Sequence, residues 1–160
     1  MSRRDDLLRL DDAALSALCE WDFFKATGPG GQKRNKTSSA VRARLVSFGI
    51  AAEDCTERSQ FRNRRNALAK VRFRLALEVR EIPAPPLEVP FGTSIRHPLY
   101  PLLAARVTDH LEEHGWDHRA ASLRLGVTPT ALLRKIAADP MWWKHFAARR
   151  RELGLPPLHP

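Results

Sequence analysis

The chain has 160 residues and a formal net charge of +9, which allows one domain or two small ones and indicates a polyanionic partner such as nucleic acid. No apolar run approaches the ~20 residues of a membrane span, and the acid-containing N-terminus is unlike a signal or transit peptide. Cys19 and Cys55 form neither a metal-binding spacing nor a disulfide framework. We therefore expect a cytoplasmic protein that does not contact membranes. A soluble protein that is merely basic is the alternative.

The first half of the chain predicts a mixed α+β fold. Leucines recur at helical spacing over residues 5–20, although Asp11 and Asp12 offer a second reading, in which a turn precedes a helix that starts near Asp12. Alternating apolar and basic residues predict a returning strand within residues 38–48. The remaining elements expected here are a short strand at 21–25, a weaker strand at 51–56 and a long basic helix at 59–80.

The second half predicts a separate helical domain. Five prolines within residues 81–98 break any helix and indicate a semi-rigid linker. Beyond it, leucine spacing and caps predict four helices, with Asp117, Thr128 and Asp139 as N-caps and Gly126 as a C-terminal stop. The expected division is 1–80, 81–98 and 99–160.

The most informative stretch is a glycine-rich loop at residues 27–37. Three glycines lie within four positions and are followed by Gln32 and a basic run. Glycine adopts positive φ freely and allows a backbone to approach another molecule closely. The tip carries no His, Cys, Asp or Glu, so chemistry here must use backbone N–H groups, one carboxamide and groups supplied by the partner. A simple turn between strands is the alternative.

The run Gly-Gly-Gln-x-x-Asn-Lys-Thr-x-Ser-Ala-Val at residues 30–41 resembles the catalytic domain of class I peptide chain release factors and their ribosome-rescue relatives. A second motif follows in the expected order, with Glu57-Arg58-Ser59-Gln60 before Arg62-Asn63-Arg64 and Ala67-Leu68. The resemblance covers about residues 20–80. It implies a small release-factor catalytic domain with a short β-sheet and a long basic helix.

The resemblance also implies the function. In this family the loop enters the peptidyl-transferase centre of the large ribosomal subunit and triggers hydrolysis of the peptidyl-tRNA ester. The catalytic residues would be Gly30, Gly31 and Gln32, with the backbone N–H of Gln32 facing the oxyanion and its amide orienting a water or ribose hydroxyl. The chain offers no general base there, so the enzyme would act only on the ribosome, with no cofactor and no metal.

Basic residues near both motifs are the candidate RNA-binding set, because cations contact phosphate. Asn35 is included because it can fix the turn by local hydrogen bonds. A charged helix face is more often simply solvated, and only its position beside the loop motif favours RNA contact. The set is Lys33, Arg34, Asn35, Lys36, Arg58, Arg62, Arg64, Arg65 and Arg72.

The chain departs from standard release factors in two ways. Lys33-Arg34 replaces a His and a small apolar residue that are more usual after the glutamine. The chain also has no room for stop-codon-reading domains, and it ends in a helical module rather than in the basic tail that is typical of short rescue hydrolases. The expected activity is therefore codon-independent peptide release in ribosome rescue.

Residues 120–136 resemble a Fis-like helix-turn-helix, with small residues at the helix crossing and a capped second helix. Thr130, Arg134 and Lys135 are the candidate nucleic-acid-binding residues of that helix. A helix pair that only packs, or that docks a protein, is equally compatible with the pattern. The alternative function for the whole chain is a non-catalytic RNA- or DNA-binding factor that uses the loop and the helix-turn-helix as binding elements.

Overall fold

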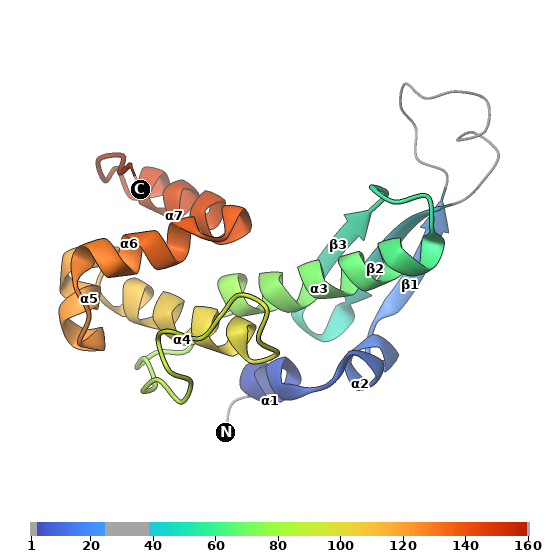
Figure 1. The fold of residues 1–160 in the computed structure, drawn as a ribbon, viewed down its shortest axis with the longest axis horizontal. Coiled ribbons are helices and arrows are strands. Elements are labelled where there is room, and N and C mark those ends of the chain that lie inside the picture. The colour runs from blue at the N-terminus through green and yellow to red at the C-terminus, as the bar shows by residue number, and fades with distance from the viewer. Residues whose placement is uncertain (1–2, 25–38, 160) are drawn as a thin grey trace. The chain divides into compact units, whose positions relative to one another are not determined.

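In the computed structural model, residues 3–24 and 39–159 are described, so the loop motif at 27–37 lies wholly outside the described residues. The chain divides into two compact units, Arg3–Leu75 and Ala76–Pro160. The boundary falls inside helix α3 (Gln60–Glu78) (Figure 1).

The first unit is a mixed α+β structure built on a three-stranded antiparallel sheet in the order β1-β2-β3. Two short helices precede the sheet, and α3 follows it and runs along the sheet (Figure 1). Asp11 caps the second short helix by accepting a hydrogen bond from the backbone N–H of Ala14, so residues 5–20 form two helices rather than one. The elements are α1 (Arg3–Arg9), α2 (Asp12–Ala17), β1 (Glu20–Phe24), β2 (Ala40–Leu45), the 3₁₀ turn η2 (Val46–Phe48), β3 (Ile50–Asp54) and α3.

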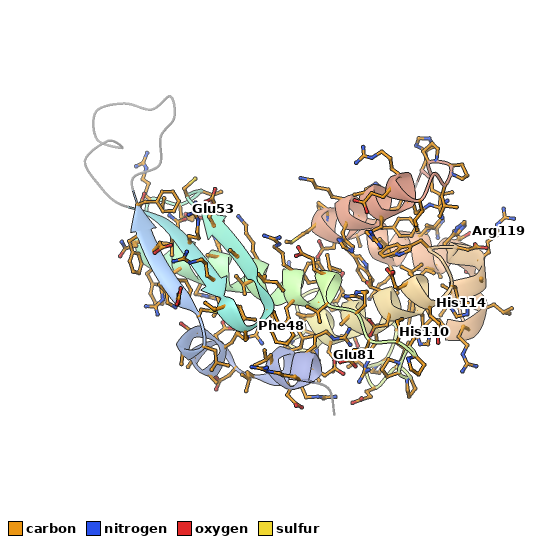
Figure 2. The ribbon with its side chains drawn as sticks, turned by 180° about the vertical axis from the view of Figure 1, so that it is seen from behind. Phe48, Glu53, Glu81, His110, His114 and Arg119 are labelled. Carbon is orange, nitrogen blue, oxygen red and sulfur yellow. The ribbon has the colours of Figure 1, made fainter. Side chains whose placement is uncertain are left out.

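Strand β2 places alternate side chains on opposite faces of the sheet. Val41, Ala43 and Leu45 are fully buried or nearly so. Arg42 and Arg44 are exposed on the other face. Cross-strand ion pairs hold them there, between Arg42 and Glu53 at 3.0 Å, and between Arg44 and both Glu20 and Asp22 at 3.5 and 3.2 Å. Figure 2 shows Glu53 on β3. Because these acidic partners neutralise the strand arginines, the sheet face is less basic than the sequence of β2 suggests.

The second unit consists of the end of α3, the proline-rich segment 81–98 and four helices. Consecutive helices from α4 onward contact each other. The core is aromatic, with Trp116, Trp142 and Phe146 each at most 1 % exposed. The helices are α4 (Tyr100–Glu113), α5 (His118–Leu125), α6 (Pro129–Ala137) and α7 (Pro140–Glu152). No helix among the described residues is long and apolar enough to cross a membrane.

Segment 81–98 packs on the helices of this unit, which differs from the linker that its prolines predict. Val89 is buried. Arg106 of α4 forms ion pairs with Glu81 at 3.3 Å and with Glu88 at 2.9 Å, and the backbone N–H of Glu81 donates to the buried carboxylate of Asp109 at 3.0 Å. The prolines end α3, but these polar contacts then fix the segment on α4.

Candidate functional site

The strands on either side of segment 25–38 pair with each other as a β-hairpin. Phe24, the last residue of β1, is the register partner of Ala40, the first residue of β2. The segment 25–38 therefore leaves and re-enters the sheet at adjacent positions. Seven predicted site residues belong to this segment and lie outside the described residues: Gly30, Gly31, Gln32, Lys33, Arg34, Asn35 and Lys36.

Asn63 ties the base of this segment to α3. Its side chain is completely buried. The amide nitrogen donates to the backbone carbonyls of Ser39 at 2.6 Å and Glu57 at 2.9 Å, and the amide oxygen accepts from the backbone N–H of Glu57 at 2.8 Å. One side chain thus connects the residue before β2, the turn before α3 and α3 itself. The two sequence motifs meet physically at this residue.

Arg58, Arg62 and Arg65 form an exposed basic group at the start of α3. Arg62 lies 3.7 Å from the Glu57 carboxylate, an exposed pair that is screened by solvent. Arg58 and Arg65 make no hydrogen bond or ion pair with any described residue. Phe61, between them in sequence, is 71 % exposed. Three cations around an exposed aromatic ring form a surface suited to phosphate and base contacts.

Arg64 faces a different neighbour. Its guanidinium lies 4.5 Å from the centre of the Trp21 ring and donates to the Ser16 hydroxyl at 3.2 Å. The side chain is exposed but is held against β1 and α2. It retains free surface for phosphate while it also stabilises the packing of α2.

Arg72, also predicted to bind RNA, is buried within the first unit. It donates to the backbone carbonyl of Leu10 at 2.5 Å and to the carboxylate of Asp12 at 2.9 Å, with a longer bond to the carbonyl of Leu8. Its side chain is 9 % exposed. Because the guanidinium satisfies carbonyls at the α1–α2 junction, we assign it a structural role and leave it out of the RNA-binding surface.

Asp54 forms a second polar centre beneath α3 that the sequence did not single out. Its carboxylate accepts from Lys70 at 2.7 Å and from Thr56 at 2.8 and 3.1 Å. Burial raises the pKa of Asp54, but the hydrogen bonds from Lys70, Thr56 and Asn66 outweigh it and leave the pKa below its ordinary value. The ionised carboxylate therefore anchors the end of β3 to α3. No local pattern marks such a residue, because its partners come from two other elements.

In the helical unit, α5 and α6 are joined by Gly126, Val127 and Thr128. Gly126 has a left-handed φ of 68°, which suits glycine, and the Thr128 hydroxyl caps α6. Thr130 and Arg134 are exposed, as the sequence predicted. Lys135 instead turns inward: its ammonium donates to the carbonyl of Thr93 and lies 5.6 Å from the Tyr100 ring centre. Burial lowers the pKa of Lys135. We therefore remove it from the candidate nucleic-acid-binding set.

Residues 14–85 match the RF-1 domain. This segment contains the hairpin, residues 25–38 and nearly all of the α3 contacts just described. The RF-1 match spans both motifs and Asn63, and it ends before α4, so the four helices of the second unit lie outside it. No solved structure matches the chain.

Curated relatives of the RF-1 region are peptide chain release factors. The chain is 36 % identical over 106 residues to peptide chain release factor 2 of Lactiplantibacillus plantarum, covering 59 % of this chain and 28 % of that protein. It is 47 % identical over 60 residues to peptide chain release factor 1 of Leptothrix cholodnii, covering 38 % and 17 %. With peptide chain release factor 1 of Xylella fastidiosa the identity is 36 % over 100 residues, covering 58 % and 28 %. The match thus spans less than a third of each relative's length.

In the described part of the chain, the residues around the β1–β2 hairpin supply cations and hydrogen-bond donors but no metal-binding set. Within residues 3–24 and 39–159, no three His, Cys, Asp or Glu residues are placed to hold a metal ion. The described part of this region pairs the residues that flank segment 25–38 and presents a basic surface beside them. A basic surface of this kind suits contact with a polyanion.

Proposed function

We propose that the chain hydrolyses the peptidyl-tRNA ester in the ribosomal peptidyl-transferase centre, independently of the codon, as a ribosome-rescue factor. The observation that carries the proposal is the RF-1 match over residues 14–85. It is supported by the geometry at the loop base, where Asn63 joins the end of the loop segment to α3. A rigid base is what a loop needs to place its tip reproducibly at a reacting bond.

The proposed chemistry uses Gly30, Gly31 and Gln32. Two glycines before Gln32 allow its backbone N–H to face the oxyanion that develops during ester hydrolysis. The Gln32 side chain offers both a donor and an acceptor, which orient the attacking water or the terminal ribose hydroxyl. Proton transfer is left to the tRNA and ribosomal RNA. The activity therefore requires the ribosome and needs no cofactor.

Phosphate contacts are assigned to the basic residues on both sides of the loop base. Arg58, Arg62 and Arg65 are exposed at the start of α3, and Arg64 offers a free guanidinium face beside Trp21. Lys33, Arg34 and Lys36 add three cations within the loop, and Asn35 is assigned to the turn. These residues would hold the domain on ribosomal RNA, whose affinity for the chain should fall steeply with salt.

The helical unit is proposed to select the ribosomal state. It lies outside the RF-1 match, and it exposes Arg119 and Leu123 on α5 and Arg134 on α6. Contacts through this unit would replace codon reading as the source of specificity. We place the proposed boundary between the catalytic and helical domains within α3, where the two compact units meet.

The test is peptide release from purified ribosomes that hold peptidyl-tRNA in the P site. An empty A site, a sense codon and a stop codon are compared for the intact chain and for Gln32→Ala. Release at similar rates in all three states, lost in Gln32→Ala while ribosome binding and thermal stability are retained, supports the proposal. Release only at a stop codon refutes codon independence.

A non-catalytic nucleic-acid-binding factor is the second candidate. The exposed Thr130 and Arg134 on a capped α6 favour it. Under this reading no ribosomal state gives release, and Gln32→Ala changes little. Arg134→Gln would then weaken nucleic-acid binding, because one phosphate or base contact is lost.

A further inference from the structure

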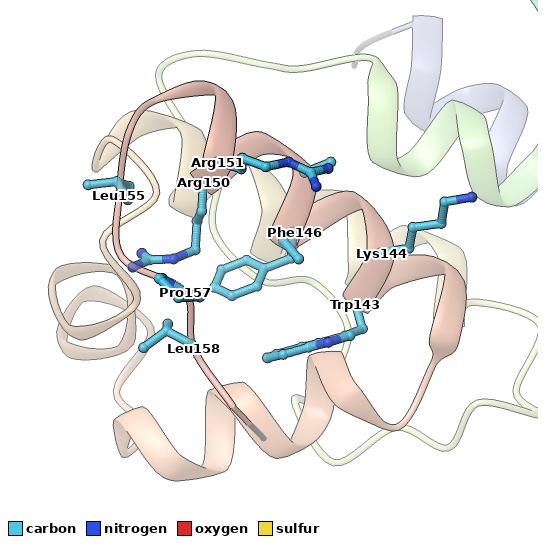
Figure 3. A pocket seen from close by; sticks show the side chains of 10 residues that line it. Trp143, Lys144, Phe146, Arg150, Arg151, Leu155, Pro157 and Leu158 are labelled. Carbon is cyan, nitrogen blue, oxygen red and sulfur yellow. The ribbon is translucent and has the colours of Figure 1, made fainter.

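A cavity of about 490 Å³ lies at the C-terminal end of the helical unit, between α7 and the residues that follow it (Figure 3). This volume is within the range of small-ligand sites. One wall is α7, and the other is the segment 155–158. The lining residues are Trp143, Lys144, Phe146, Ala147, Ala148, Arg150, Arg151, Leu155, Pro157 and Leu158.

Arg150 builds the cavity by fastening its two walls together. Gly154 turns the chain with a left-handed φ of 68°, and the N–H of Leu155 donates back to the carbonyl of Arg150 at 2.9 Å. The Arg150 guanidinium, whose residue is 6 % exposed, donates to the carbonyls of Pro156 at 2.9 Å and Trp116 at 2.5 Å. The cavity is therefore part of the folded unit and not a chance gap beside a loose end.

The walls are flat and apolar. Trp143 and Phe146 lie with ring centres 5.6 Å apart and tilted by 35°. Their rings point from α7 toward Pro157 and Leu158 of the opposite wall (Figure 3). Phe146 is buried, so the ring that remains accessible on this wall is that of Trp143. A slot between this ring and a proline ring suits a planar group that stacks, and every nucleobase has such a face.

Among the described residues, the charged side chains that line the cavity are all cations. They are Lys144, Arg150 and Arg151. Lys144 and Arg151 are exposed and make no hydrogen bond or ion pair with the described part of the chain. The buried Nε of Arg150 likewise has no hydrogen-bond partner there. Arg149, one position earlier, is by contrast paired with Glu152 at 2.6 Å and Glu112 at 3.5 Å.

We propose that this cavity binds one unpaired nucleotide of ribosomal RNA. The base stacks on Trp143, whose ring is backed by the buried ring of Phe146, and the phosphate meets Arg151. Stacking surfaces next to unpaired cations are how proteins bind single-stranded nucleic acid. An acidic peptide would satisfy the charge but makes no use of the flat aromatic wall, so RNA is favoured. The site itself does not depend on peptide release; only the ribosomal source of the RNA rests on the proposed function.

The test is the affinity of the full chain for a short fluorescein-labelled single-stranded RNA without ribosomes. Trp143→Ala should weaken binding by roughly tenfold, since a base-stacking partner is lost. Trp143→Phe should retain most of the affinity. Arg151→Gln should weaken binding and reduce its salt dependence, whereas Arg149→Gln is the matched control and should change little. Arg151 is exposed, so its variant keeps the test valid if Trp143→Ala does not fold.

Ultraviolet crosslinking with 4-thiouridine RNA, followed by peptide mapping, separates this site from the basic group on α3. Crosslinks within residues 143–158 support the proposal. Equal affinity for all variants, or crosslinks confined to residues 3–75, overturns it. Binding of an Asp/Glu-rich peptide without measurable RNA binding also overturns it and identifies a peptide site. Gln32→Ala should bind this RNA normally, so loss of release and loss of cavity binding are separate outcomes.

Discussion

The side-chain amide of Asn63 donates a 2.6 Å hydrogen bond to the backbone carbonyl of Ser39, which lies 24 positions earlier in the sequence. Ser39 is the first described residue after segment 25–38, and Asn63 is the fourth residue of α3. The two sequence motifs, at residues 30–41 and 57–68, are therefore held together by a buried side-chain amide. This contact explains why an asparagine occupies a position surrounded by arginines in an otherwise basic helix.

Asn63→Ala should lower the free energy of unfolding by about 2–4 kcal/mol, because it leaves the N–H of Glu57 and the carbonyls of Ser39 and Glu57 without the buried amide as their partner. Asn63→Asp should be at least as harmful, since a carboxylate cannot donate to the carbonyls of Ser39 and Glu57. Chemical denaturation of both variants measures the effect. Asn66→Ala is the control, since Asn66 is only partly buried and its bond to Asp54 is 3.4 Å long. An Asn63→Ala variant as stable as the control would contradict the bridging role.

Variants of Arg72 and Arg65 should distinguish a structural role from a role in RNA binding. Arg72→Met removes donors to the α1–α2 junction and should destabilise the first unit by about 2–3 kcal/mol. Arg65→Met, on an exposed site, should change stability by less than about 0.5 kcal/mol but weaken binding to ribosomal RNA. Thermal melting and RNA binding, measured on both variants, give the comparison. A stable Arg72→Met variant with impaired RNA binding would return Arg72 to the binding surface.

Local signals in the sequence predicted the element order well. Asp117, Thr128 and Asp139 are N-caps as expected, and Gly126 ends α5 in the left-handed conformation. Such signals act within a few residues, so a single sequence displays them. The sequence of residues 5–20 is compatible with one helix or two, and the N-cap at Asp11 shows that there are two.

Burial of charged residues could not be predicted in the same way. Arg72 and Lys135 look like surface cations in sequence, but their partners are 62 and 42 positions away. The inward turn of Lys135 depends on how segment 81–98 packs, and its prolines predicted a linker. The loop chemistry was inferred from its motif alone, because its residues lie outside those the structure describes.

Lys135 and Arg134 provide a second matched pair, on α6. Lys135→Ala should lower the stability of the helical unit by about 1–2 kcal/mol, because the lysine stem and ammonium pack on Phe91 and Tyr100 and bond to Thr93. Arg134→Ala should be close to neutral for stability. Urea denaturation followed by tryptophan fluorescence measures both. If Arg134→Ala were the more destabilising change, the assignment of outward and inward faces would be reversed.

His145 should make the helical unit sensitive to acid. The half-buried imidazole lies 5.6 Å from the Trp116 ring centre, and burial, with a further contribution from Arg80, lowers its pKa from 6.5 to about 4. The unfolded chain therefore binds a proton more readily than the folded chain between these values. Stability is fully present above about pH 6.5 and falls as the pH is lowered toward 4.

His145→Gln removes this proton uptake and should flatten the dependence of melting temperature on pH between about 6.5 and 4. Some dependence should remain, because burial also lowers the pKa of His110 and His118 in the same unit. His159→Gln, at an exposed histidine, is the control and should keep the slope of the parent chain. Melting followed by circular dichroism at several pH values decides the matter: an unchanged slope in His145→Gln would show that other groups carry the acid sensitivity.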